Sequence, residues 1–291
     1  MKKIFVLFIV LGMFSCKQAK KETASDESRA TEVAKPEIKL YTFSGGTVVA
    51  NMLELFSQDT TYTGQSKEFA DAFYVIVHPK GTLMWDAGLP EGLVGMAEPF
   101  TSPDGAFTVS RKDSVVNQLA SIGMTPGDID YISLSHTHFD HVGHANVFAG
   151  STWIVQEKEY DFITSEESQK NNADSYNAIK GLTNIKKING DYDVFGDGSV
   201  VMKFMPGHTP GHQVLYLDLV EHGPLLLSGD MYHFYENREF RRVPIFNYDV
   251  AQTRTSMAAF EAFAEEKGAK VYLQHAKGDF EKFPKAPNYL K

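Results

Sequence analysis

The chain has 291 residues, which could form one large domain or two average ones, and 43% of them are hydrophobic, enough for a sizeable core. Its 28 basic and 37 acidic residues give a net charge of −9, which argues against nucleic-acid binding because that function needs a basic surface. The single cysteine, Cys16, excludes a disulfide scaffold and a cysteine zinc finger.

Residues 1–16 are typical of an export signal. Lys2 and Lys3 precede an apolar run over 4–14, and the small residue Ser15 stands directly before Cys16. The run is too short to span a bilayer permanently. The cysteine is placed as in the lipobox of bacterial lipoproteins, which it resembles. We therefore expect an exported protein, held by a lipid on Cys16 in the bacterial periplasm or outer membrane; a plain signal peptide is the alternative.

Residues 17–37 contain no aromatic residue and no apolar periodicity, and their charges nearly cancel. Such a segment cannot bury enough apolar surface to order itself, so it is predicted to be a flexible tether. The folded domain is therefore expected over 38–291.

Within this domain, strands and helices are predicted to be mixed along the chain. Residues 73–77 and 82–85 predict a hairpin, and a helix is expected from Asp113 or Ser114 to Gly123. A second helix is predicted over 250–267, with Gly268 as its end. Further strands are expected at 131–135, 152–155, 185–188, 200–205, 213–219, 225–227 and 271–273. Many strands with a few helices favour sheets covered by helices.

The densest signal for function is the string SHTHFDHVGH at 135–144, which holds four of the ten histidines. Histidine is the commonest metal ligand, and aspartate supplies a hard oxygen. His136 and His138 lie two apart at the end of a strand and therefore point to one side. Asp140 and His141 follow where the chain turns, so four ligands can converge. The string predicts a metal site.

Three further candidate ligands also come at the ends of predicted strands. His208 lies in the loop MPGHTPGH at 205–212, Asp230 follows an apolar strand, and His275 follows the last strand. Ligands at strand ends can be held rigidly over the edge of a sheet.

This whole pattern resembles the metallo-β-lactamase fold superfamily over nearly all of 38–291. The resemblance implies an α/β (α+β) fold, a four-layer αββα sandwich, and two divalent metal ions. Carried over by position, the resemblance implies that the first metal is bound by His136, His138 and His208. The second metal is then bound by Asp140, His141 and His275, and Asp230 bridges the two metals. The two carboxylates and the lack of a thiolate suit zinc, and also iron, cobalt or manganese. Asp86, in an Asp-x-Gly turn, is expected to hydrogen-bond a ligand.

The segment from 228 to 249 resembles the N-acyl homoserine lactonases, which are quorum-quenching enzymes. This resemblance implies that a hydroxide between the two metals opens the lactone ring, while Asp140 carries a proton. Many of these enzymes carry a tyrosine three residues after the bridging aspartate, to contact the substrate carbonyl. Here that position is His233, with Tyr232 before it, and either could take the role.

The expected partner is therefore a small acyl lactone, and no nucleic acid is expected to bind. Contact with the membrane is expected only through the lipid anchor. A homodimer is possible. The alternatives are another hydrolase of the same fold (a glyoxalase II-like thioesterase, a phosphodiesterase or a β-lactamase) and, from another class, a metal-binding lipoprotein without catalysis. Of the remaining histidines, His144 and His212 are expected to be structural, and His78 and His222 to be solvated.

Overall fold

The computed structural model describes Met1 and residues 35–291. The predicted signal segment with Cys16 and the predicted tether up to residue 34 lie outside the described residues. Among the residues that are described, no helix combines the length and the apolar character that a membrane span requires.

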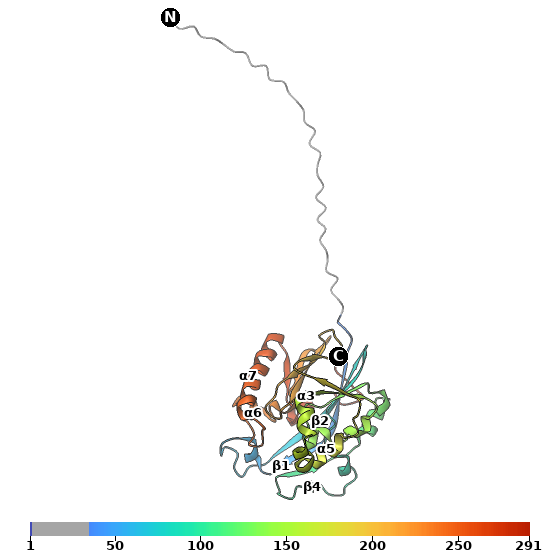
Figure 1. Cartoon of the computed structure of the whole chain (residues 1–291), viewed down its shortest axis with the longest axis vertical. Coiled ribbons are helices and arrows are strands. Elements are labelled where there is room, and N and C mark those ends of the chain that lie inside the picture. The colour runs from blue at the N-terminus through green and yellow to red at the C-terminus, as the bar shows by residue number, and fades with distance from the viewer. Residues whose placement is uncertain (2–34) are drawn as a thin grey trace. The chain divides into compact units, whose positions relative to one another are not determined.

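Two β-sheets form the centre of residues 35–291 (Figure 1). The first sheet contains β1 (Lys39–Ala50), β2 (Lys67–His78), β3 (Gly81–Trp85), β4 (Phe100–Thr101), β5 (Phe107–Ser110), β6 (Tyr131–Ser133), β7 (Thr152–Gln156) and β8 (Ile185–Ile188). The second contains β9 (Tyr192–Asp193), β10 (Val200–Phe204), β11 (Gln213–Leu219), β12 (Gly223–Leu227) and β13 (Lys270–Tyr272). The strand orders are β4-β5-β1-β2-β3-β6-β7-β8 and β13-β12-β11-β10-β9.

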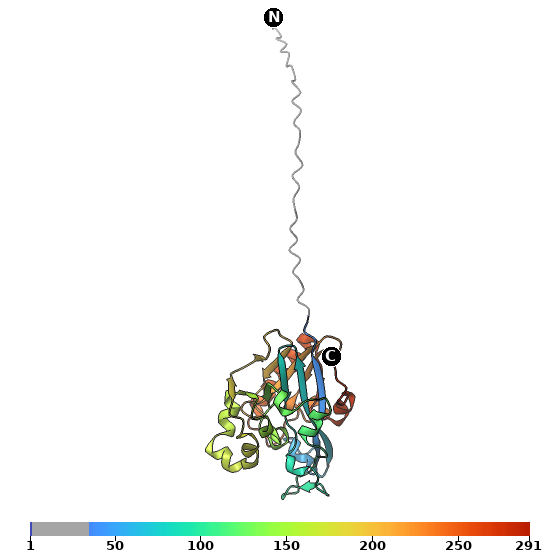
Figure 2. The same cartoon turned by 90° about the vertical axis from the view of Figure 1, so that its right-hand side faces the viewer.

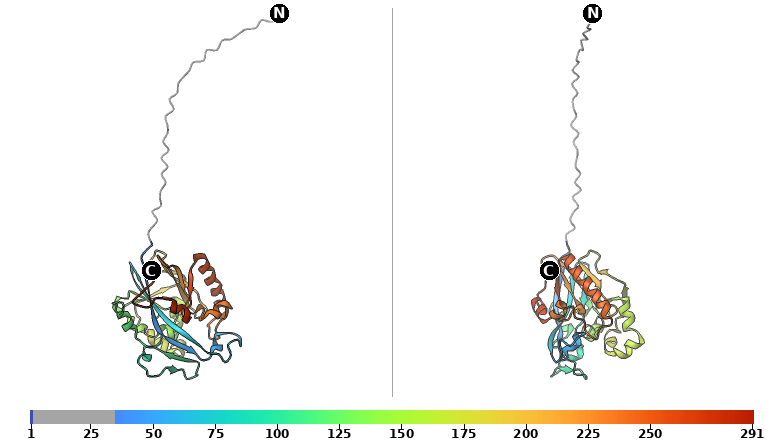
Figure 3. Two further views of the ribbon diagram at one scale, coloured as in Figure 1. Left: turned by 180° about the vertical axis from the view of Figure 1, so that it is seen from behind. Right: turned by 90° about the vertical axis from the view of Figure 1, so that its left-hand side faces the viewer.

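The α-helices are α1 (Val115–Ala120), α2 (Phe139–Val142), α3 (Glu157–Ile163), α4 (Glu166–Asn171), α5 (Ala173–Ile179), α6 (Tyr235–Glu239), α7 (Val250–Lys267) and α8 (Lys277–Lys282). The longest, α7, lies on the outside of the second sheet (Figures 1 and 3). Helices α1, α3 and α5 lie on the outer face of the first sheet (Figure 2).

Three apolar layers hold these elements together. Between the sheets, Leu83 and Trp85 of β3 share a buried cluster with Leu215 and Leu217 of β11. The outer face of the first sheet buries residues of the flanking helices, such as Leu119 of α1. The outer face of the second sheet buries residues of α7, namely Met257, Phe260 and Ala264. The layers therefore run helix, sheet, sheet, helix, which confirms the αββα sandwich that the resemblance implies.

Several local predictions are confirmed. β2 and β3 form the expected antiparallel hairpin, with Tyr74 opposite Trp85. The side chain of Ser114 accepts a hydrogen bond from Asn117 N and caps α1. Gly268 ends α7 in the left-handed conformation, at φ 58°, which glycine adopts without strain.

Other elements were not predicted. No element was assigned to β1, whose sequence KLYTFSGGTVVA is interrupted by two glycines, or to the short polar helices α3, α4 and α5. β1 bends at a register shift between Ser44 and Gly46, where these glycines stand.

The strand directions decide where the site lies. β3 and β6 are parallel, as are β12 and β13, and β10 runs in the direction of β12 because both are antiparallel to β11. Taken in chain order, the loops that follow β3, β6, β10, β12 and β13 contain Asp86, His136, His208, Asp230 and His275, respectively. Carboxyl ends of strands in such sheets form a crevice where ligands bind, which explains why segments far apart in the sequence supply one site.

Candidate metal centre

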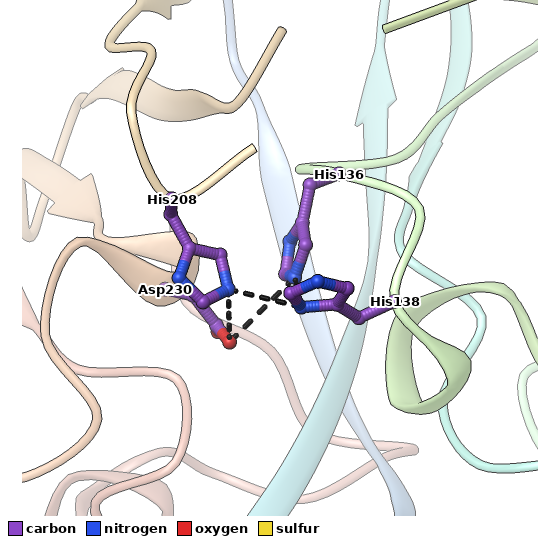
Figure 4. Close-up of side chains that lie close together, drawn as sticks. All are labelled: His136, His138, His208 and Asp230. Atoms are coloured by element: carbon purple, nitrogen blue, oxygen red, sulfur yellow. Dashed lines mark hydrogen bonds and ion pairs between the residues drawn. The ribbon is translucent and has the colours of Figure 1, made fainter. Parts of the chain in front are cut away.

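The structure brings the seven predicted ligands together in two groups. The first consists of His136, His138, His208 and Asp230, and one ligand-type atom of each lies within 4.8 Å of the others (Figure 4). His138 Nδ1 lies 2.9 Å from His136 Nε2 and 3.0 Å from His208 Nε2. Asp230 Oδ2 lies 3.3 Å from His208 Nε2 and 3.6 Å from His136 Nε2.

The second group consists of Asp140, His141 and His275, again within 4.8 Å. The Nε2 atoms of His141 and His275 are 3.3 Å apart, and each lies 3.8 Å from an oxygen of Asp140. The other oxygen of Asp230, Oδ1, is 3.2 Å from His141 Nε2 and 3.0 Å from His275 Nε2. Asp230 therefore presents one oxygen to each group and lies between them.

The protonation of three of these imidazoles follows from their outer contacts. The Nδ1 atoms of His141, His208 and His275 face an oxygen of Asp86 at 3.1 Å, Oδ1 of Asn247 at 2.9 Å and the carbonyl of Ala70 at 2.9 Å, respectively. These oxygens accept from Nδ1–H, so each ring turns its Nε2 atom toward the centre, where it can bind a metal ion.

Ring nitrogens and carboxylate oxygens converge here in a buried place, and few hydrogens are available for them to share. The imidazoles of His136, His141, His208 and His275 are all at most 2% exposed, so water does not compensate for this clustering. A cation in each group satisfies all these atoms at once. The donor set of nitrogen and carboxylate oxygen therefore fits divalent metal ions.

The electrostatics of the centre agree with this fit. Burial lowers the pKa of His136 and His138 well below the usual range, and the neighbouring imidazoles lower it further, so both rings are neutral. Burial works to raise the pKa of Asp230, but His275 and His141 hold it well below its usual range. Neutral imidazoles and an ionised carboxylate are the forms that bind metal.

The field at the second group favours positive charge. Burial disfavours a charged His275, yet the Asp230 carboxylate raises the pKa of this ring to about 9. The pKa of His141 is also raised, because Asp230 and Asp86 outweigh burial.

Asp86 lies where the resemblance placed it, beside a predicted ligand. It adopts a left-handed conformation at φ 60°, which is costly for a residue other than glycine. Its Oδ1 accepts from Ser135 N at 2.6 Å, and its Oδ2 accepts from Gln274 Nε2 at 2.6 Å and faces His141. The strained turn therefore orients His141 and joins the ends of three strands.

Glu159, at the start of α3, was not predicted as part of the centre. It accepts four hydrogen bonds, from the amide and hydroxyl of Thr137, the hydroxyl of Thr209 and the amide of Gly211. A Cβ at Gly211 would lie 2.4 Å from the Cβ of Glu159, so only glycine fits there. Glu159 thus joins the histidine string to the loop of His208. No motif marks it, because the partners lie far away in the sequence.

The remaining histidines have defined places. His212 donates from Nδ1 to the carbonyl of Met205 and accepts the amide of Asp230 at Nε2, both at 2.9 Å, so it supports the loop instead of facing the centre. His144 lies 3.0 Å from Glu91. His222 is half-buried, 3.0 Å from the hydroxyl of Tyr272. The expectation that His78 is solvated was wrong.

His78 is 4% exposed, because the loop after β9 covers it. Its ring stacks on Phe195 with centroids 4.1 Å apart, and its Nε2 lies 3.1 Å from Asp197.

A cavity of about 420 Å³ opens beside both groups, and its polar end includes His138, Asp140, Asp230, His233 and His275. Its remaining walls are almost entirely apolar and come from six segments: Val48, Leu55, Phe56, Phe69, Phe107, Phe139, Ile245 and Phe246, with Asp104 as the one other acid.

The two candidates for contact with a substrate carbonyl are placed differently. His233 lines the cavity, with its Nε2 3.0 Å from Asp230 Oδ2. Tyr232 is 1% exposed and packs against Phe260 of α7, with ring centroids 5.8 Å apart, so its side chain belongs to the core of the second sheet. Of these two side chains, that of His233 is the one that lines the cavity.

Comparisons with known proteins agree with this geometry. The family model of the metallo-beta-lactamase superfamily matches residues 69–275. The chain is 29% identical over 277 residues to the N-acyl homoserine lactonase AttM of Azorhizobium caulinodans, a match that covers 87% of this chain and 98% of that protein. It is 32% identical over 233 residues to an N-acyl homoserine lactonase of a Bacillus species, a match that covers 77% of this chain and 88% of that protein.

Solved structures give the same result. An N-acyl homoserine lactone hydrolase with N-hexanoyl-L-homoserine bound at its catalytic metal center matches with a TM-score of 0.72 and 26% identity, over 88% of this chain and 100% of that one. AidC, a dizinc quorum-quenching lactonase, matches in fold alone, with a TM-score of 0.63 and 17% identity. This match covers 88% of this chain and 95% of that one.

Proposed function

The chain belongs to the metallo-beta-lactamase superfamily, and from this premise we propose that it is a metal-dependent hydrolase that opens the lactone ring of N-acyl homoserine lactones. The observation that carries the proposal is one cavity with two ends of different chemistry. One end holds the two ligand groups, and the walls leading from it are apolar. An acyl lactone has this same division into a polar ring and an apolar chain.

The first group, with Asp230, would hold one metal ion, and the second group, also with Asp230, would hold the other. Zinc suits these ligands, as do iron, cobalt and manganese. When bound, two such ions supply water of lowered pKa and polarise a carbonyl oxygen.

Asp140 is the ligand-group carboxylate best placed to move a proton. Its side chain is 13% exposed and lines the cavity, whereas the side chain of Asp230 is 4% exposed and surrounded by imidazoles. In the hydrolysis, a bond forms from the water oxygen to the lactone carbonyl carbon, and the bond from that carbon to the ring oxygen breaks. We assign to the Asp140 carboxylate the transfer of the water's proton to the departing ring oxygen.

His233 is our candidate for the substrate's carbonyl oxygen. Its ring lies at the polar end of the cavity, with Nε2 3.0 Å from Asp230 Oδ2. The ring therefore stands where a carbonyl at that end would lie, and we assign its N–H to the carbonyl oxygen. A donor at such a position stabilises the charge that develops on the oxygen.

The apolar walls account for the acyl chain. The cavity volume of about 420 Å³ is in the usual range for a small-molecule site. Each buried CH₂ contributes about 0.8 kcal/mol, so longer chains should bind more tightly until the cavity is filled. Within the described part of the chain, no lysine or arginine lines this cavity. This lining disfavours a phosphodiester substrate, which would be anionic.

Turnover of a substrate panel tests the proposal. Protein loaded with two equivalents of zinc should open acyl homoserine lactones with chains of different length, faster than it cleaves a thioester, a phosphodiester or a β-lactam. Protein stripped of metal is the control and should be inactive until metal is restored. Cleavage of the thioester without ring opening would reject the lactonase assignment and leave the family assignment intact.

A further inference from the structure

A buried carboxylate outside both ligand groups lies close to the second one. Asp71, on β2, pairs with Gly46 directly after the register shift in β1. Its side chain is 0% exposed, and neither of its oxygens has a hydrogen-bond partner among residues 35–291. The residue before it, Ala70, accepts the Nδ1–H of His275. An ionised carboxylate in this environment is costly unless another charge compensates for it.

The backbone around Asp71 closes tightly against its side chain. A Cβ at Gly45 would lie 2.8 Å from Asp71 Oδ2 and 2.7 Å from the Cα of Gly88. Gly88 itself has φ 71°, and a Cβ there would lie 2.5 Å from the Cα of Gly45. Two glycines thus allow β1 and the loop after β3 to close around the carboxylate.

Arg111 is a permanent cation that acts on Asp71, but its hydrogen bonds go elsewhere. It is 3% exposed, and its Nη1 donates to the carbonyls of Ala87 and Leu89. Its Nη2 has no partner in the described part of the chain.

Backbone hydrogen bonds place Asp71 beside the second ligand group. Ala70 N donates to the carbonyl of His275 at 3.2 Å, and the amide of Ala87, next to Gly88, donates to the carbonyl of His141 at 2.8 Å. Burial raises the pKa of Asp71 to about 7, with His275 opposing the rise, Asp140 adding to it, and His141 and Arg111 opposing it. The carboxylate therefore lies beside one half of the centre.

We propose that Asp71 is an electrostatic positioning residue, whose buried negative charge stabilises a metal ion held by Asp140, His141 and His275. This proposal rests on the proposed function, because it needs a metal at the second group. Asp71 is a ligand in neither group, so it acts through the field and not by coordination. The ion compensates for the carboxylate, and the carboxylate in turn strengthens the binding of the ion.

The test is the Asp71→Asn variant, which keeps the side-chain shape and removes the charge. Wild type, Asp71→Asn and the control Asp104→Asn are loaded with two equivalents of cobalt(II). Metal per chain and the cobalt absorption spectrum are then followed during titration with a chelator. Asp104 is an exposed carboxylate of the cavity wall outside both groups.

We expect Asp71→Asn to lose one of its two ions at a chelator concentration about 10–100-fold lower than wild type requires, and to keep the other ion. The spectrum of the retained ion should be that of a nitrogen-rich site. Metal-free Asp71→Asn should melt at the same or a higher temperature than metal-free wild type, because an uncompensated buried charge has been removed.

Two ions bound as in wild type, or both lost in parallel, would overturn the proposal. A variant that fails to fold, or melts at a lower temperature without metal, would do the same, because Asp71 would then be a structural partner of Arg111. Wild type that holds fewer than two ions would overturn the proposed function itself, so the two failures are distinguishable.

Discussion

The most direct test of the proposed two-metal centre is a substitution that removes the negative charge of Asp230. Its Oδ1 lies 3.0–3.2 Å from the Nε2 atoms of His275 and His141, and its Oδ2 lies 3.3–3.6 Å from those of His208 and His136. Ions that bind these nitrogens would lie about 4 Å or less from the carboxylate charge. At that distance two unit charges interact by about 4 kcal/mol at an effective dielectric constant of about 20, which is the lower bound for a divalent ion.

Asp230→Asn should therefore weaken the binding of each ion by at least about three orders of magnitude, since 1.36 kcal/mol corresponds to a factor of ten. The assay is elemental analysis after dialysis against buffered free zinc, followed by lactone turnover. Wild type should retain two ions per chain, and the variant one or none, with a matching loss of turnover. Asp104→Asn makes the same change in the cavity wall and should retain both ions. An Asp230→Asn protein with two ions of unchanged affinity would refute the reading of Asp230 as the shared ligand.

Four further predictions follow from individual side chains. His233→Ala should lower kcat about 10–100-fold, equivalent to about 1.4–2.7 kcal/mol of barrier, with unchanged metal content; a fully active variant would remove His233 from the carbonyl contact. Phe246→Ala should raise KM for long-chain lactones by about tenfold and leave short-chain substrates unaffected, measured as kcat/KM against chain length, and a uniform loss would contradict an acyl-chain role. Burial lowers the pKa of His78, with Asp197 opposing, so the unfolded chain takes up a proton below about pH 6.5 that the folded one does not; stability should therefore fall as the pH drops through this range, and His78→Gln should flatten that fall in pH-dependent thermal melts. Wild type should partition into detergent with membranes, and Cys16→Ser should release it or leave the precursor uncleaved; a soluble mature protein without an acyl group would favour a plain signal peptide.

The seven candidate ligands could be found from the sequence because each follows the end of a strand that was itself predictable. The string at 135–144 is local, and strand ends at His208, Asp230 and His275 are marked by the change from apolar residues to glycine, proline or polar residues. Parallel strand directions then bring these ends together. Short local segments of the sequence are therefore enough to predict the ligands of the centre.

The residues that support and shape the site leave no such local signal. Glu159 acts through hydrogen bonds to residues 22–52 positions away, and the cavity wall combines residues from Val48 to Phe246. Asp71 lies in the strand segment FADAF, where alternation alone does not say that its face is buried. His78 stands beside a tight turn, and only the packing of the loop at 193–199 shows that it is covered. Tertiary packing decides each of these cases.

The side chains at the polar end of the cavity are held by more contacts than those at its apolar end. At the polar end, His141, His208 and His275 each have an outer acceptor, and His212 holds the backbone of Asp230, so a change in any ligand disturbs several strands. At the apolar end, Ile245 and Phe246 are 55% and 40% exposed and lie on a loop between α6 and α7. Substitutions on that loop change the surface offered to an acyl chain without touching a ligand or its outer acceptor. Chain-length preference can therefore diverge among relatives that share the same ligands, and specificity in this enzyme should be altered first at positions 245 and 246.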